Sequence, residues 1–121
     1  MKSKANANRP NVIRKSFLSY LRTQFPYTED WVHPETKTVF EHSEVKRILE
    51  AYRKMDPVGY KPLWYLWTTQ GTRAFIAEQI NYSAPTVKRR WDKSIDKIML
   101  FLLFPSLIPE DYVLYQSLMD T

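Results

Sequence analysis

The stretch IAEQINYSAPTVKRRWDKSID, residues 76–96, decides how this chain folds. It consists of an apolar segment, a short polar turn, and then a dense run of lysine and arginine around a tryptophan. Apolar side chains recur at three- and four-residue steps on both sides of the turn, which predicts a helix on each side. We therefore expect two packed helices, the second of which carries a basic face.

The spacing within this segment is typical of a helix-turn-helix. That motif needs a small residue in its first helix, an apolar residue three positions later, a tight turn, and an apolar anchor about ten positions after the small residue. Ala77, Ile80, Asn81 and Val87 meet these needs in order. Asn81 stands where the turn often requires a left-handed backbone, which Asn tolerates better than most residues. The motif is expected at about residues 72–104.

The second helix of the motif is expected to begin near Ser83, which can cap its first turn, and to run until Pro105. At about 100° per residue, an apolar stripe from Val87 to Leu102 faces the core, and basic side chains cover the opposite and flanking sides. The residues expected to contact DNA are Ser83, Ala84, Thr86, Lys88, Arg89, Arg90, Lys93 and Lys97.

Different parts of this face are expected to contact different parts of the DNA. Residues early in a recognition helix can reach base edges, and later ones more often meet phosphates. Arg89 is our first choice for a bidentate contact with guanine. Lys88 lies at the edge of the face beside Asp92.

The longer stretch IAEQINYSAPTVKRRWDKSIDKI resembles the C-terminal helix-turn-helix of bacterial sigma factors. In length and layout the chain is more similar still to phage transcriptional regulators of the ArpU and RinA type. The resemblance covers roughly residues 60–104. It implies a small helical protein that controls transcription of phage late or structural genes.

Composition and periodicity predict an all-α fold with about five helices. The chain has 121 residues, of which 44% are apolar and only 2 are glycine, which favours helices over a many-turned β-sandwich. The first helix is expected over the stripe from Val12 to Phe25, followed by an aperiodic loop, residues 26–42, with a small hairpin at TKTVF. Ser43 is expected to cap the second helix, and Pro62 to stand in the first turn of the third, which would run to Gly71.

The expected domain organisation is a flexible basic arm, residues 1–10, and one helical DNA-binding domain, residues 11–121. The tail, residues 105–121, carries more apolar side chains than a small domain readily covers. Phe101 and Phe104 are also expected to point away from the core. Either the tail folds back on the domain or it meets a second copy of the chain. We expect the second, a homodimer interface, since helix-turn-helix proteins commonly bind two half-sites.

Charge is distributed unevenly along the chain. The first sixteen residues carry five bases and no acid, residues 17–72 are balanced, and residues 73–97 carry six bases against three acids. This distribution suits a polyanionic partner touched at two places, and double-stranded DNA is the partner we expect. Whether the N-terminal arm reaches a minor groove or is a plain disordered terminus stays open at this stage.

Catalysis has little support in the sequence. There is no Gly-rich phosphate loop, nucleophile elbow or paired-carboxylate motif. The chain has no cysteine, and the pair His33 and His42 is too little for a metal site, so we expect no cofactor and no enzyme activity. The longest apolar run has seven residues, too few to span a membrane, and the expected location is the cytoplasm of a bacterial host.

Two other functions fit the same features. One is DNA packaging, as in the small subunit of a phage terminase, which also joins a helix-turn-helix to an oligomerising helix. The other is a protein-binding module that contacts RNA polymerase and leaves the basic face unused. Trp64, Trp67 and Trp91 are expected to pack in the core rather than stack on bases.

Overall fold

The computed structural model describes the backbone of residues 2–109 and the side chains of residues 10–109. Over this part of the chain it contains five α-helices and one two-stranded hairpin, which confirms the predicted all-α fold class. The helices are α1 (Lys2–Thr23), α2 (His42–Met55), α3 (Pro57–Thr69), α4 (Arg73–Gln79) and α5 (Ala84–Leu103). The hairpin strands are β1 (Trp31–Val32) and β2 (Val39–Phe40), and short 3-10 helices lie at Phe25–Tyr27 and Pro105–Leu107.

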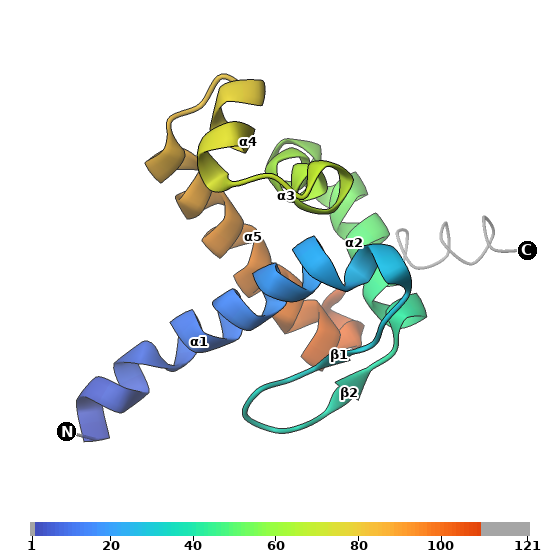
Figure 1. Ribbon diagram of the computed structural model, residues 1–121. Coiled ribbons are helices and arrows are strands. Elements are labelled where there is room, and N and C mark those ends of the chain that lie inside the picture. The colour runs from blue at the N-terminus through green and yellow to red at the C-terminus, as the bar shows by residue number, and fades with distance from the viewer. Residues whose placement is uncertain (1, 110–121) are drawn as a thin grey trace, which may run out of the picture.

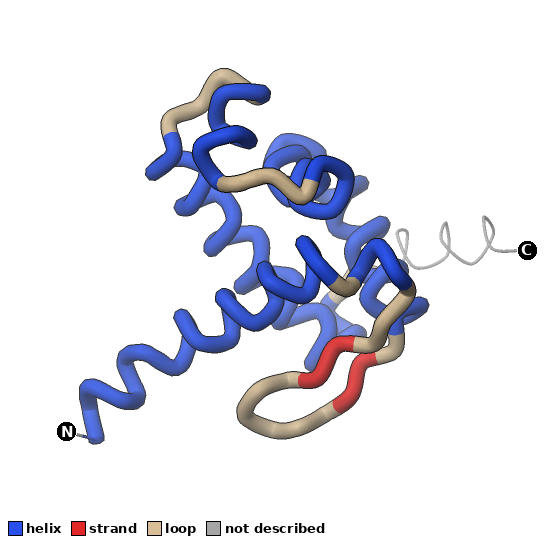
Figure 2. The backbone as a smooth tube through the Cα atoms, viewed as in Figure 1, coloured by secondary structure: helices blue, strands red, loops and turns tan. Residues whose placement is uncertain are grey.

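Helices α1, α2, α3 and α5 enclose the core, and α4 lies at the opposite end of the molecule from the hairpin (Figures 1 and 2). The core is apolar because each helix turns its apolar stripe inward. Its fully buried side chains are Phe17, Leu21, Val45, Ile48, Leu49, Tyr52, Leu63, Leu66, Ile76, Val87, Ile95 and Ile98. Val87, Ile95 and Ile98 belong to the apolar stripe predicted for the fifth helix, and Trp91 and Leu102 of the same stripe are buried as well.

Helix α1 is longer than the sequence predicted. It begins at Lys2, so residues 2–10 of the segment expected as a flexible arm have helical backbone, with Pro10 inside the helix. Val12 is half exposed, and the first buried side chain of the helix among the described ones is Phe17. The N-terminal half of α1 therefore projects away from the other helices, as Figure 1 shows.

The aperiodic loop forms the small hairpin that was predicted, with Trp31 paired to Phe40. The start of α2 differs from the prediction, because Ser43 lies inside the helix and Glu41 occupies the capping position without a side-chain hydrogen bond. The first N–H group, that of His42, donates instead to Asp30 Oδ1 at 2.9 Å. A carboxylate distant in sequence thus replaces the local cap, and such a partner leaves no spacing signal.

The third helix also begins earlier than predicted. Pro57 opens α3 and Asp56 caps it, accepting a hydrogen bond from Gly59 N at 3.0 Å, so Pro62 lies inside the helix rather than in its first turn. At the other end the helix stops at Thr69, and Gln70 rather than Gly71 adopts the left-handed conformation, with φ of 54°.

Two predictions about large side chains were wrong. Trp64, expected in the core, has 43% of its surface exposed, whereas Trp67 is half-buried against the core and Trp91 is buried. Phe101, expected to point outward, is buried on α5, while Phe104 is exposed as predicted. The predicted tail is described only as far as residue 109, and the rest of it lies outside the described residues.

No helix within residues 2–109 is both long enough and apolar enough to cross a membrane.

Candidate nucleic-acid interface

Helices α4 and α5 and the turn between them form the predicted helix-turn-helix. Thr72 caps α4 by accepting from Phe75 N at 3.1 Å, and Ala77 and Val87 are buried where the two helices pack. Asn81 has a φ of 62°, the left-handed conformation expected at the turn. Because only residues 80–83 join the two helices, the beginning of α5 is held beside α4.

A chain of hydrogen bonds organises the beginning of α5. Ser83 Oγ accepts from Thr86 N at 3.2 Å, which confirms the predicted cap, and lies 2.7 Å from Thr86 Oγ1. Arg89 Nη2 in turn donates to Thr86 Oγ1 at 3.2 Å. The guanidinium predicted to read a base is thereby tied to Thr86, and its other N–H groups make no hydrogen bond to a described residue.

The exposed face of α5 has a shallow hollow of about 330 Å³ that is lined by Thr86, Arg89, Arg90 and Lys93. Three of these side chains are cationic, and all three are exposed. No acidic side chain lines the hollow, so an anion there would meet positive charge on several sides. Four of the eight predicted contact residues are thus brought together on one surface.

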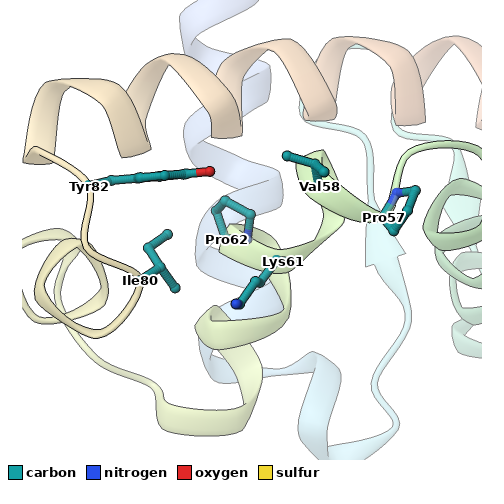
Figure 3. Close-up of a pocket in the computed structure, with 6 residues that line it drawn as sticks. All are labelled: Pro57, Val58, Lys61, Pro62, Ile80 and Tyr82. Atoms are coloured by element: carbon teal, nitrogen blue, oxygen red, sulfur yellow. The ribbon is translucent and has the colours of Figure 1, made fainter.

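Arg90 has an aromatic neighbour that the sequence did not indicate. Its guanidinium carbon lies 5.4 Å from the centre of the Tyr82 ring, within the range of a cation–π interaction. Tyr82 also borders an apolar groove of about 300 Å³ with Ile80 and residues of α3, which Figure 3 shows. The tyrosine therefore joins the basic face to an apolar surface beside the turn.

Two of the other predicted contact residues, Lys88 and Ala84, are placed less favourably. Lys88 is exposed, but its Nζ lies 2.8 Å from Asp92 Oδ2, one helical turn further on. This ion pair offsets part of the charge of Lys88. Ala84 is half-buried at the beginning of α5, so it offers little surface to a ligand.

Lys93 and Lys97 lie near Asp56, the residue that caps α3. Burial tends to raise the pKa of this carboxyl group, but the net pKa is lowered, because hydrogen bonds from Gly59 N and Tyr52 and the charges of the two lysines outweigh desolvation. One acid is therefore shared between the cap of α3 and the basic face of α5.

The opposite face of α5 is held in the core by polar contacts as well as apolar ones. Trp91 Nε1 donates to the carbonyl oxygen of Pro62 at 3.0 Å. The hydroxyl of Tyr52 donates to Asp56 Oδ2 at 2.9 Å and lies 2.8 Å from Ser94 Oγ, and burial raises the pKa of this tyrosine to about 12. These contacts fix the rotation of α5 about its axis, and thereby the direction of its basic face.

The two histidines of the loop are engaged elsewhere. His33 is buried, and its Nδ1 accepts from the backbone N–H groups of Glu35 and Thr36 at 3.2 and 3.3 Å. His42 Nε2 lies 3.1 Å from the carbonyl oxygen of Phe25. Within the described residues no group of three or more His, Asp or Glu side chains is arranged to hold a metal ion.

Comparison with known proteins returns no match: no family model, no curated protein and no solved structure is similar to this chain.

Proposed function

We propose that this chain is a sequence-specific DNA-binding protein that regulates transcription, and that α5 enters the major groove of duplex DNA. The observation that carries the proposal is the exposed basic face of α5 in a helix-turn-helix whose cap and turn have the expected geometry. A helix fits the major groove, and Arg presents the paired donors that match guanine O6 and N7.

The beginning of α5 supports different roles for different residues of this face, some in base contacts and others in phosphate contacts. Thr86 and Arg89 lie in the first two turns, where base edges come within reach, and Arg90 and Lys93 flank them on the same hollow. The N–H groups at the start of α5 and Ser83 favour a phosphate. The arrangement thus supplies both base reading and backbone contacts.

A phage or mobile-element setting is part of the proposal and comes from the resemblance of residues 60–104 to sigma-like phage regulators. A genetic test is to find whether the gene that encodes the chain lies next to the operator that the protein selects. RNA polymerase is the further partner that such a regulator would contact.

We propose a homodimer as the form that binds DNA. Exposed apolar side chains gather at the end of α5 and just beyond it, namely Leu100, Leu103, Phe104 and Leu107. Two recognition helices on one duplex would add their contacts at high effective concentration. Sedimentation of the full chain at micromolar concentration tests this, and a monomer under those conditions contradicts the dimer.

The decisive experiment for DNA binding is selection of bound sequences from a pool of random duplexes. We expect enrichment of one motif, and a palindromic motif would reveal both the operator and the dimer. Absence of any enrichment would contradict sequence-specific binding. A ring-sized solution mass together with DNA binding would instead favour the packaging function.

Protein binding is the second candidate function, and the groove in Figure 3 is the observation that favours it. Val58, which lines this groove, is half exposed, and Trp64 further along α3 is exposed as well. An apolar surface of this kind suits a protein partner such as RNA polymerase. Val58→Glu should abolish binding to that partner while DNA affinity stays unchanged.

A further inference from the structure

The basic face of α5 has a neighbour in α1. Arg14 Nε and Nη2 donate to the two carboxylate oxygens of Asp96, at 2.9 and 2.6 Å, and this hydrogen bonding raises the pKa of the guanidinium. Such a paired contact fixes direction as well as distance. The bond therefore fastens α1 to one particular side of α5.

That side is the one that carries Arg89. Arg89 and Asp96 are seven residues apart, so they lie within about 20° of each other around the helix axis. Helix α1 consequently crosses α5 two turns beyond Arg89 on the same side of α5. A duplex that meets Arg89 must pass close to α1.

A groove of about 670 Å³ lies between α1, α4 and α5, and its lining residues on α5 are Lys88, Trp91 and Asp92, on the Arg89 side of this crossing. Its cationic lining residues are Arg14, Lys15, Arg73 and Lys88. Arg14 and Lys88 are paired with Asp96 and Asp92, whereas Lys15 and Arg73 have no acidic partner within ion-pair distance among the described residues. Two positive charges on facing helices thus remain for an external anion.

Beyond this groove the N-terminal half of α1 projects past the other helices (Figure 1). Lys2, Lys4 and Arg9 lie in it, and the first sixteen residues include no acid. At the helical rise the stretch from Lys2 to Asn11 is about 15 Å long, the length of roughly four phosphate steps along one DNA strand.

We propose that the groove between α1 and α4 and the projecting half of α1 together form a second contact with the DNA backbone, beside the major-groove contact of α5. This inference rests on the proposed function. The basic N-terminal segment would contact the phosphates that flank the site in the duplex. These phosphates carry charge but no sequence information. The α1 contact extends the bound stretch beyond the bases that α5 reads.

The experiment compares two double variants of the full chain, Lys4→Gln with Arg9→Gln and, as a matched control, Lys46→Gln with Arg47→Gln, whose side chains are exposed on α2. Each is titrated at several salt concentrations with a short duplex that holds only the selected site, and with a duplex about ten base pairs longer on each side. Each lost phosphate contact lowers the salt slope by about one unit.

We expect the Lys4 and Arg9 variant to lose about two units of slope on the long duplex and to match the unsubstituted protein on the short one. The control should match the unsubstituted protein on both. A Lys15→Gln with Arg73→Gln variant should lose about two units of salt slope on both duplexes, because the groove borders α5, which binds the site that both duplexes contain.

Each contrary result has its own meaning. An unchanged slope for the Lys4 and Arg9 variant on the long duplex, or an equal loss in the α2 control, would overturn the projecting contact. An unchanged slope for the Lys15 and Arg73 variant would overturn the groove contact. If the unsubstituted protein shows no salt-dependent binding to either duplex, the proposed function fails together with this inference.

Discussion

The two faces of α5 differ in how their polar groups are satisfied. On the buried face, the Trp91 indole and the Ser94 hydroxyl each have a hydrogen-bond partner in the core. On the exposed face, Arg89, Arg90 and Lys93 share a hollow without an acidic side chain. Buried polar groups need hydrogen-bond partners inside the protein, whereas exposed cations are solvated by water and stay available to a ligand. The contrast separates the residues that hold the helix from those that offer it for binding.

The largest effect should come from the buried face. Trp91→Ala removes a buried indole and its hydrogen bond to Pro62, so the free energy of unfolding should fall by about 3–5 kcal/mol. Urea denaturation followed by circular dichroism measures it. Arg89→Ala is the matched variant on the other face and should stay within about 0.5 kcal/mol of the unsubstituted protein. Similar losses in both variants would erase the contrast.

The next effect concerns binding rather than stability. Arg89→Ala should weaken binding to the selected site by about 1–3 kcal/mol and relax the preference at one base position. Fluorescence anisotropy with duplexes substituted at each position measures both. Arg47→Ala on α2 is the control and should leave affinity unchanged. An equal loss on all sequences would make Arg89 a phosphate contact instead.

A third prediction sharpens the boundary between the faces, where Asp56 lies. Asp56→Ala removes the cap of α3 and should lower the free energy of unfolding at pH 7 by about 1 kcal/mol. The pKa of Asp56 is lowered in the folded protein, so its stabilising effect is present above the ordinary value of 3.8 and is lost as pH falls through the folded value.

The difference between Asp56→Ala and the unsubstituted protein should therefore shrink below pH 3.8. Thermal unfolding from pH 7 to pH 2.5 follows it. A difference that stays constant over this range would mean that the carboxylate charge does not contribute.

The smallest effect is expected at the far end of the exposed face. Lys93→Ala and Lys97→Ala should each reduce the salt slope of DNA binding by about one unit, with equal loss for specific and non-specific duplexes. Titration at four salt concentrations measures it. An unchanged slope for either variant would remove that lysine from the interface and shorten the binding face to the first turns of α5.

The helix-turn-helix could be predicted from the sequence because its determinants are local. Ala77, Asn81 and Ser83 act through spacing, backbone conformation and capping, all within a few residues of one another. The same holds for the apolar stripe of α5. Local rules of this kind can be read without tertiary information.

The errors arose where distant residues decide the outcome. Asp30 bonds to the first N–H of α2 from across the hairpin, which displaced the expected cap at Ser43. Phe101 was assigned outward from the helix repeat, yet it is buried. The contact of Tyr82 with Arg90 and the bond of Arg14 to Asp96 join side chains through the tertiary fold, and residue spacing does not encode them.

The backbone at Asn81 has a consequence for how far related chains can drift in sequence. Its φ of 62° suits glycine, asparagine and aspartate and is costly for β-branched side chains. Most exposed positions on α1 and α2 carry no such restriction, so a homologue can differ there freely while keeping the turn. We therefore expect homologues to conserve position 81 longest, together with the small buried residue four places before it and the hydroxyl two places after it.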